Sequence, residues 1–286
     1  MGVQGLLSGR DVDCNRAGKD DRLIWRTVAC AIFALVVPFI ISFANVSAQS
    51  VPQYVTPHEA SSHGVDTALI VAMNVSSSVD ERRYQIQLEG IAAALEDPGV
   101  IDAILSGPRK SILFSVVTWA DRPKTSLPWI KIASIADARI AALKVRTMPR
   151  EGGDFTCVSK MLRNITDKII PQLPEPALKI VVDVSGDGSD NCNAQESVQD
   201  VRDEMNGRGT TTNGLPILEG REAATLEGWY RDNVMGGPGS FVLPAMGFED
   251  FPRAIRQKFV VEISGIDPVL QRGFANSQIA QIKSPK

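Results

Sequence analysis

Short, nearly continuous apolar runs alternate with longer segments of helical periodicity along most of this chain. Residues 66–73 (DTALIVAM) open the series with the pattern of a strand that is buried on both faces. Further strands, some of them short edge strands, are expected at 111–119, 127–132, 178–184, 210–217 and 240–243. Apolar residues at helical spacing predict helices over 80–95, 135–143, 158–169, 196–206, 226–234 and 249–263.

This alternation predicts the fold class: an α/β fold with a doubly wound, mostly parallel sheet flanked by helices. The sequence contains no internal repeat and no second core pattern, so residues 65–264 are expected to form one domain. A polar linker over 49–64 precedes it, and a loose tail over 265–286 follows it. Ser78 and Glu81 form a possible capping box for the first helix. In such folds ligands bind at the carboxyl ends of the strands.

The N-terminal segment has the pattern of an export signal. Arg22 and Arg26 precede an apolar run over 28–44, and Ala48 ends a Val-Ser-Ala sequence of the kind that signal peptidases cleave. Residues 1–48 are therefore predicted to be a signal peptide, which would make the mature protein periplasmic or extracellular. The alternative is an N-terminal anchor in the inner membrane, because the run is close in length to the shortest spanning helices of ~17–25 residues.

The charged and titratable residues exclude several classes of function. The net charge of −3 gives no basic surface for nucleic acid, so nucleic acid is not an expected partner. A membrane is an expected partner only through the N-terminal segment. The two histidines, His58 and His63, both fall in the predicted linker. A hydrolase that depends on a histidine base, or a zinc site rich in histidine, is therefore not expected.

Two of the four cysteines belong to the part of the chain that is predicted to be exported. Cys14 and Cys30 lie in the leader, which leaves Cys157 and Cys192. Disulfides persist in exported proteins, so we predict that these two cysteines form a bridge. The alternative is a pair of free, buried thiols.

Oxygen-bearing side chains stand after predicted strands or at the starts of helices. They are Asn74, Ser76 and Ser78 after the first strand, Thr156 before a helix, and Asp187 after the 178–184 strand. Hydroxyl, amide and carboxylate oxygens form a hard ligand set that suits Mg²⁺, with Mn²⁺ or Ca²⁺ as alternatives. The sequence thus predicts a metal site at the carboxyl edge of the sheet.

These residues resemble the metal-ion-dependent adhesion site (MIDAS) of von Willebrand factor A domains, whose pattern is Asp-x-Ser-x-Ser with a threonine and a further aspartate. The turn at 181–188 (VVDVSGDG) resembles the family's fourth strand, and 213–217 and 236–242 are typical of a bacterial subfamily of unknown function. The resemblance implies a non-catalytic module that binds a protein or another acidic ligand through the metal. Asn74 replaces the family's first aspartate, which implies weaker metal binding or a metal-free interaction domain.

An enzymatic interpretation is the other alternative. Residues 186–190 (GDGSD) resemble the acidic turn of Mg²⁺-dependent phosphatases of the haloacid-dehalogenase type. Those enzymes need a nucleophilic aspartate after the first strand, where this chain has Asn74. An amide does not form an acyl-phosphate, so the residues favour a binding protein.

Asp183 stands inside the apolar 178–184 run. An unpaired carboxylate is costly in such a place. We therefore expect Asp183 to be structural and hydrogen-bonded to a neighbouring loop, with a direct role at the metal as the alternative.

Overall fold

The computed structural model describes residues 63–192 and 195–265. The predicted leader, most of the linker and nearly all of the tail lie outside these residues. Among the residues that are described, no helix is long and apolar enough to cross a membrane. The candidate span at 28–44 falls outside that part of the chain.

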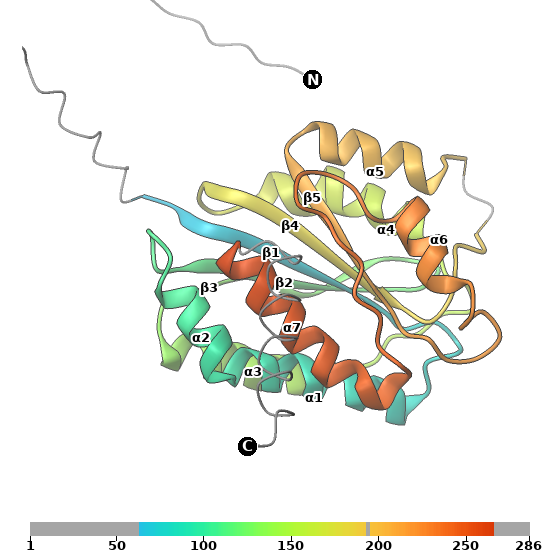
Figure 1. Cartoon of the computed structure of the whole chain (residues 1–286), viewed down its shortest axis with the longest axis horizontal. Helices are drawn as coiled ribbons and strands as arrows, with labels where there is room; N and C mark the ends of the chain where they lie inside the picture. Colours follow the sequence, from blue (N-terminus) through green and yellow to red (C-terminus); the bar gives the residue numbers. More distant parts are fainter. Residues whose placement is uncertain (1–62, 193–194, 266–286) are drawn as a thin grey trace, which may run out of the picture. The chain divides into compact units, whose positions relative to one another are not determined.

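A single five-stranded sheet forms the centre of the fold (Figure 1), and it confirms the predicted fold class. The strand order is β3-β2-β1-β4-β5, and only β3 at the edge is antiparallel to its neighbour. The strands are β1 (Val65–Asn74), β2 (Ile112–Trp119), β3 (Lys124–Ile132), β4 (Ala177–Gly186) and β5 (Thr210–Pro216). Every residue of β1 is buried, as expected for a central strand that is covered on both faces.

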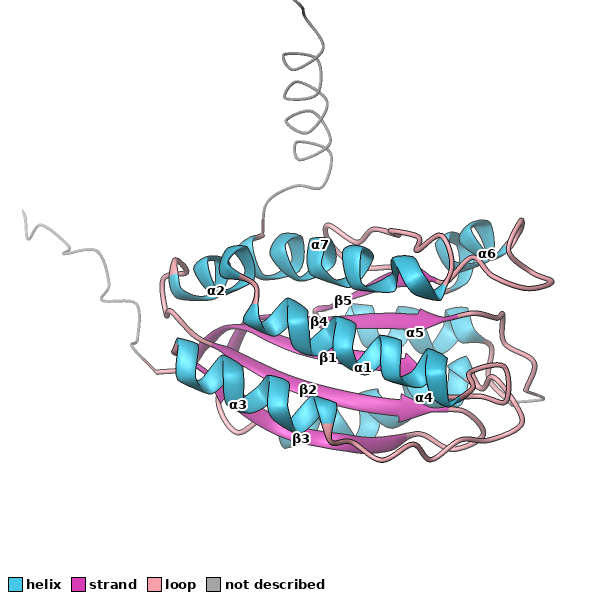
Figure 2. Cartoon of the chain, turned by 90° about the horizontal axis from the view of Figure 1, so that it is seen from below, coloured by secondary structure: helices cyan, strands magenta, loops and turns pink. Residues whose placement is uncertain are grey.

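Helices cover both faces of the sheet, and Figure 2 shows the layer formed by α1, α2, α3 and α7 in front of the strands. Its members are α1 (Glu81–Glu96), α2 (Pro98–Leu105), α3 (Ile135–Arg146) and α7 (Phe251–Ser264). The opposite layer consists of α4 (Val158–Asn164), α5 (Val198–Gly207) and α6 (Leu226–Asn233). Alternate side chains of β1 enter the two cores: Leu69 packs with the first layer and Ile70 with the second.

The helix predicted over 158–169 is divided in the structure, and one helix was not predicted. After α4 the chain continues as a π-helical turn, Ile165–Ile169, and then a 3-10 turn, Ile170–Gln172. Pro171 in that turn has no N–H to donate, so a regular helix cannot continue through it. The unpredicted helix is α2, which begins at Pro98 after Asp97, whose carboxylate accepts from the amides of the first turn.

Two local predictions were wrong. The strand expected at 240–243 is absent, and Val242 forms only an isolated bridge with Gly214. The capping box is also absent. Asp80 caps α1 by accepting from the Arg83 amide at 2.8 Å, and the Ser78 hydroxyl points to another partner, described below.

A fully buried charge cluster joins the sheet to α7. The Lys258 ammonium lies 3.3 Å from a carboxylate oxygen of Asp183 on β4 and 3.0 Å from one of Glu262. Asn213 donates to Glu262 at 2.9 Å, and Lys258 lies over the ring of Phe241. The expectation that a loop holds Asp183 is therefore wrong, because its partner is a lysine on a helix. Burial and, to a smaller extent, the charge of Glu262 raise the pKa of Asp183, Lys258 lowers it, and the net value is about 8.

Candidate functional site

Asn74 ends β1 and lies behind the predicted site rather than in it. Its side chain is fully buried, and Oδ1 accepts hydrogen bonds from the backbone amide of Ser76 at 2.8 Å and from the Ser76 hydroxyl at 2.6 Å. A backbone amide can only donate, so this contact fixes which end of the Asn74 side chain faces Ser76. Asn74 therefore holds the Ser76 hydroxyl in position and does not line the cavity described next.

The other four predicted ligands converge at the carboxyl edge of the sheet. Ser76, Ser78, Thr156 and Asp187 line one cavity of about 330 Å³. The hydroxyl oxygens of Ser76 and Ser78 are 3.1 Å apart, and the Ser78 hydroxyl donates to Asp187 Oδ1 at 2.9 Å. The sheet order explains the convergence, because β4 lies beside β1 and both strands end at this edge.

The donor set fits a hard divalent cation. Neighbouring ligands of an octahedral ion at ~2.1 Å are about 3.0 Å apart, close to the spacing between the Ser76, Ser78 and Asp187 oxygens. Burial raises the pKa of Asp187, while the Ser78 hydrogen bond and the charge of Arg83 lower it. A buried carboxylate with few cationic neighbours is stabilised by a cation. The described residues contain no group of three or more His, Cys, Asp or Glu suited to a metal, so a bound ion would depend on the hydroxyls.

Sequence reasoning missed the charged residues around the cavity. Arg83 of α1 donates to the Ser78 carbonyl at 2.6 Å and to Glu219 at 2.5 Å. Glu222 accepts from the Ser189 amide at 2.8 Å. Both glutamates belong to the loop after β5, which ends at the same edge as β4, so the strand order would have indicated that loop. Nothing in the sequence indicated Arg83 in this way, because arginine is a common residue at the exposed start of a helix.

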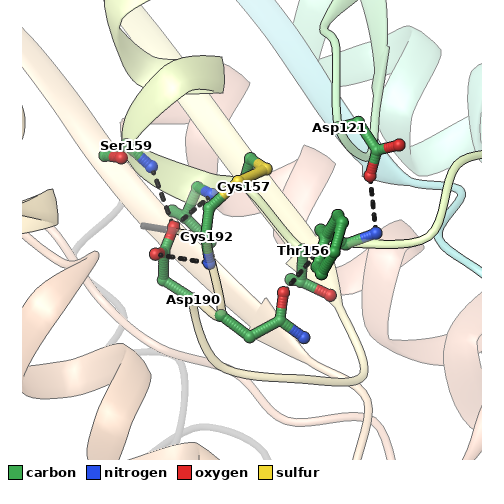
Figure 3. Close-up of a disulfide and its surroundings, with 9 residues drawn as sticks. Asp121, Thr156, Cys157, Ser159, Asp190 and Cys192 are labelled. Atoms are coloured by element: carbon green, nitrogen blue, oxygen red, sulfur yellow. Dashed lines mark hydrogen bonds between the residues drawn. A yellow bond between two sulfur atoms is a disulfide. The ribbon is translucent and has the colours of Figure 1, made fainter. Parts of the chain in front are cut away.

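The disulfide drawn in Figure 3 joins Cys157, which follows Thr156, to Cys192, which lies in the loop after Asp187. Cys157 and Cys192 are bonded, with their Cα atoms 5.0 Å apart, which confirms the predicted pair. Next to the bridge, Thr156 donates its amide to the Asn191 side chain at 2.7 Å, and the Asn191 amide returns a bond to the Thr156 carbonyl at 3.0 Å.

Asp190 completes this link between the loops. Its Oδ1 accepts from the amides of Val158 and Ser159 at the start of α4, and its Oδ2 accepts from the Cys192 amide (Figure 3). A carboxylate at a helix N-terminus satisfies free amides and interacts favourably with the helix dipole. Thr156 is therefore held by a covalent bridge and by hydrogen bonds on both sides of it.

Comparisons with known proteins agree with this architecture. A family model described as "Protein of unknown function (DUF1194)" matches residues 64–267. No curated protein sequence gives a match.

Solved structures with a similar fold include proximal thread matrix protein 1 from the mussel byssus, at 17% identity and a TM-score of 0.53 over 70% of this chain and 48% of that chain. The same protein with a zinc-occupied MIDAS motif gives 18% identity, a TM-score of 0.52 and the same coverage. A von Willebrand factor type A protein from Catenulispora acidiphila gives 16% identity and a TM-score of 0.51 over 70% of this chain and 43% of that chain. This chain thus spans less than half of each of these three chains. The matches confirm the resemblance to the von Willebrand factor A fold.

Proposed function

This chain belongs to the family described as a protein of unknown function (DUF1194), and we propose that it is an exported, non-catalytic binding module whose metal site engages an acidic group of a partner. The observation that carries the proposal is the convergence of the Ser76 and Ser78 hydroxyls with the Asp187 carboxylate at the spacing of neighbouring metal ligands. One similar solved structure carries zinc in a motif of the same type, which supports a metal here.

Ser76, Ser78 and Asp187 would hold the ion, and Thr156 lines the same cavity. When bound, Mg²⁺, Mn²⁺ or Ca²⁺ supplies a positive centre with an open position for a carboxylate of a protein or other acidic ligand. The chain's own residues prepare this site. Asn74 orients the Ser76 hydroxyl, and Arg83 fixes the Ser78 loop against the loop that carries Glu219.

The disulfide supports an exported location, because such bridges persist in oxidising compartments and are rare in the cytosol. The predicted signal peptide or anchor at 1–48 is in agreement with that location. Retention of the 28–44 run would attach the module to the inner membrane, and cleavage after Ala48 would release it.

Loss of the carboxylate at Asp187 should weaken metal binding most directly. We expect Asp187→Asn to lower the affinity for Mn²⁺ by about one hundredfold, because it removes the one formal charge among the proposed ligands and keeps the side-chain shape. Calorimetric titration of the exported protein with Mn²⁺ and Mg²⁺ measures this. Asp232→Asn, a change in an exposed carboxylate that does not line the cavity, is the matched control. Equal affinities for all three proteins would contradict the proposed site.

Restoring the family's carboxylate should strengthen the site. We expect Asn74→Asp to raise Mn²⁺ affinity by about ten- to hundredfold, because a negative charge behind Ser76 attracts a divalent ion. The same change should destabilise the protein in chelator, since it buries a second carboxylate near Asp187. Titration and thermal melts in chelator test both parts. Unchanged affinity together with an unchanged melting temperature would show that position 74 does not act on a cation.

The same experiments distinguish the alternatives. Native protein that binds no divalent ion would favour a metal-free interaction domain. Turnover of a generic phosphate ester that is lost in Asp187→Asn would favour the phosphatase. The structure adds an argument against the phosphatase, because Asn74 Oδ1 is buried and hydrogen-bonded to Ser76 and thus is not placed to attack a phosphate.

A further inference from the structure

The buried side chains of Trp119 and Tyr230 meet that of Asn74 on the sheet face covered by α4, α5 and α6. Asn74 is the register partner of Trp119 at the end of β2, and Gly186 ends β4 on the other side of β1. Tyr230 of α6 packs against the same place. A Cβ built on Gly186 would lie 2.8 Å from the Tyr230 hydroxyl, 3.1 Å from Asn74 Cβ and 3.5 Å from the Trp119 ring. These three side chains therefore surround one point.

Each of these side chains has a polar atom without a hydrogen-bond partner in the part of the chain that the structure describes. The atoms are Asn74 Nδ2, Trp119 Nε1 and the Tyr230 hydroxyl oxygen, and all three are buried. An unpaired buried donor costs ~1–3 kcal/mol, so three in one place require an explanation.

The hydrogen-bonding capacity of the side chain at position 74 explains why Asn74 and Trp119 do not pair with each other. Asn74 Oδ1 is used by Ser76, which leaves only the donor Nδ2 for the rest of the pocket. The Trp119 indole N–H is also only a donor, so the two groups cannot pair. A carboxylate at position 74 would keep the contact with Ser76 and would present a second acceptor oxygen to the indole and the phenol.

We propose that Trp119 and Tyr230 form a donor pocket that positions the side chain at 74, and that this pocket can donate to a carboxylate there hydrogen bonds that the amide cannot accept; these bonds offset part of the repulsion between such a carboxylate and Asp187. Tyr230 is then a positioning residue that acts through residue 74 on the Ser76 hydroxyl. The absence of a side chain at Gly186 is part of the pocket, because a Cβ there would displace the Tyr230 hydroxyl. The consequence for metal binding depends on the proposed function, but the pocket itself does not.

A double-mutant cycle in chelator tests the pocket without any metal. In the native background, we expect Tyr230→Phe to lower the unfolding equilibrium constant by about fivefold or more, because it removes a buried hydroxyl that has no partner. In the Asn74→Asp background, the same change should instead raise that constant by about tenfold or more, because it removes a hydrogen bond to a buried carboxylate. Urea unfolding of the full-length exported protein and its variants measures both.

Tyr84→Phe is the matched control. The Tyr84 hydroxyl donates to the carbonyls of Met148 and Pro149, so its loss should cost the same in both backgrounds. Equal effects of Tyr230→Phe in the two backgrounds would overturn the proposal, as would an Asn74→Asp protein that is unfolded in chelator. Nuclear magnetic resonance gives a second readout: the Trp119 indole proton should shift downfield in Asn74→Asp. If Tyr230→Phe has different effects in the two backgrounds but the protein binds no Mn²⁺, the pocket is supported and only the proposed metal function is contradicted.

Discussion

Lys258→Met is expected to lower the free energy of unfolding by about 3–5 kcal/mol. Among the residues that the structure describes, the Lys258 ammonium is the only cation that forms an ion pair with the Asp183 or Glu262 carboxylate. All three side chains are fully buried. Methionine has a similar volume but leaves the Glu262 carboxylate in an apolar core without a counter-charge, beside the Asp183 carboxyl group, whose pKa of about 8 keeps it largely protonated at neutral pH. Urea unfolding at neutral pH measures the loss.

A second substitution separates charge from packing. Asp183→Asn in the Lys258→Met background removes the cost of burying or protonating this carboxyl group, so it should recover part of the lost stability. Lys179→Met changes a lysine on β4, the strand of Asp183, that donates to the Ile263 carbonyl and is reached by the charge of Glu262 but forms no ion pair with the cluster, so it should cost much less. A loss of similar size in Lys179→Met, without recovery by Asp183→Asn, would show that packing rather than charge explains the effect.

The pH dependence of stability gives an independent check on the cluster. The pKa of Asp183 is about 8 in the folded protein against an ordinary value of 3.8, so the folded state holds a proton that the unfolded state releases. The stability that this group contributes is therefore present below the lower value and is lost as the pH rises through the higher one. Asp183→Asn should flatten the decline between these values. A native protein and variant with identical pH profiles would contradict the assignment.

Removal of the disulfide is expected to cost about 3–4 kcal/mol, because a bridge between residues 35 apart in sequence restricts the unfolded chain. The test compares native protein with Cys157→Ala/Cys192→Ala in urea, each with and without a reducing agent. Reduction should destabilise only the native protein, to about the level of the double variant. Since the bridge links the loops that carry Thr156 and Asp187, the double variant should also bind Mn²⁺ more weakly.

Thiol counting under denaturing conditions provides the control for this prediction. Native protein from an oxidising compartment should show no free thiol at Cys157 or Cys192. Two free thiols, or equal stability of the native protein and the double variant, would show that the bridge does not form in the cell.

The apolar pattern of the chain was sufficient to predict the sheet. Each central strand is buried on both faces, and this requirement is visible in the local sequence as a nearly continuous apolar run, as in 66–73 and 178–184. The helix α2 was missed because eight residues are too few to show a clear period, although Asp97 and Pro98 together are a helix-start signal. The strand predicted at 240–243 is absent because a short apolar run has the same pattern in a strand and in a buried loop.

Ser76, Ser78 and Asp187 could be placed together from the sequence because they follow parallel strands that end at a common edge of the sheet. Thr156 lies between α3 and α4 and follows no strand, so its place was expected from the family motif and not from the strand pattern. The same argument does not give the direction of a side chain. Asn74 belongs to the motif, yet its backbone turn places it behind Ser76, where it meets Trp119 and Tyr230.

By itself, then, the sequence determined the fold class, the edge of the sheet where the hydroxyls and Asp187 meet, and the cysteine pair. Only the tertiary structure decided which charges face one another. Arg83 pairs with Glu219, and Lys258 enters the core beside Asp183, across long separations in the chain. The physical reason is that burial is a property of single residues and shows in local periodicity. The partner of a charge depends on how helices cross the finished sheet.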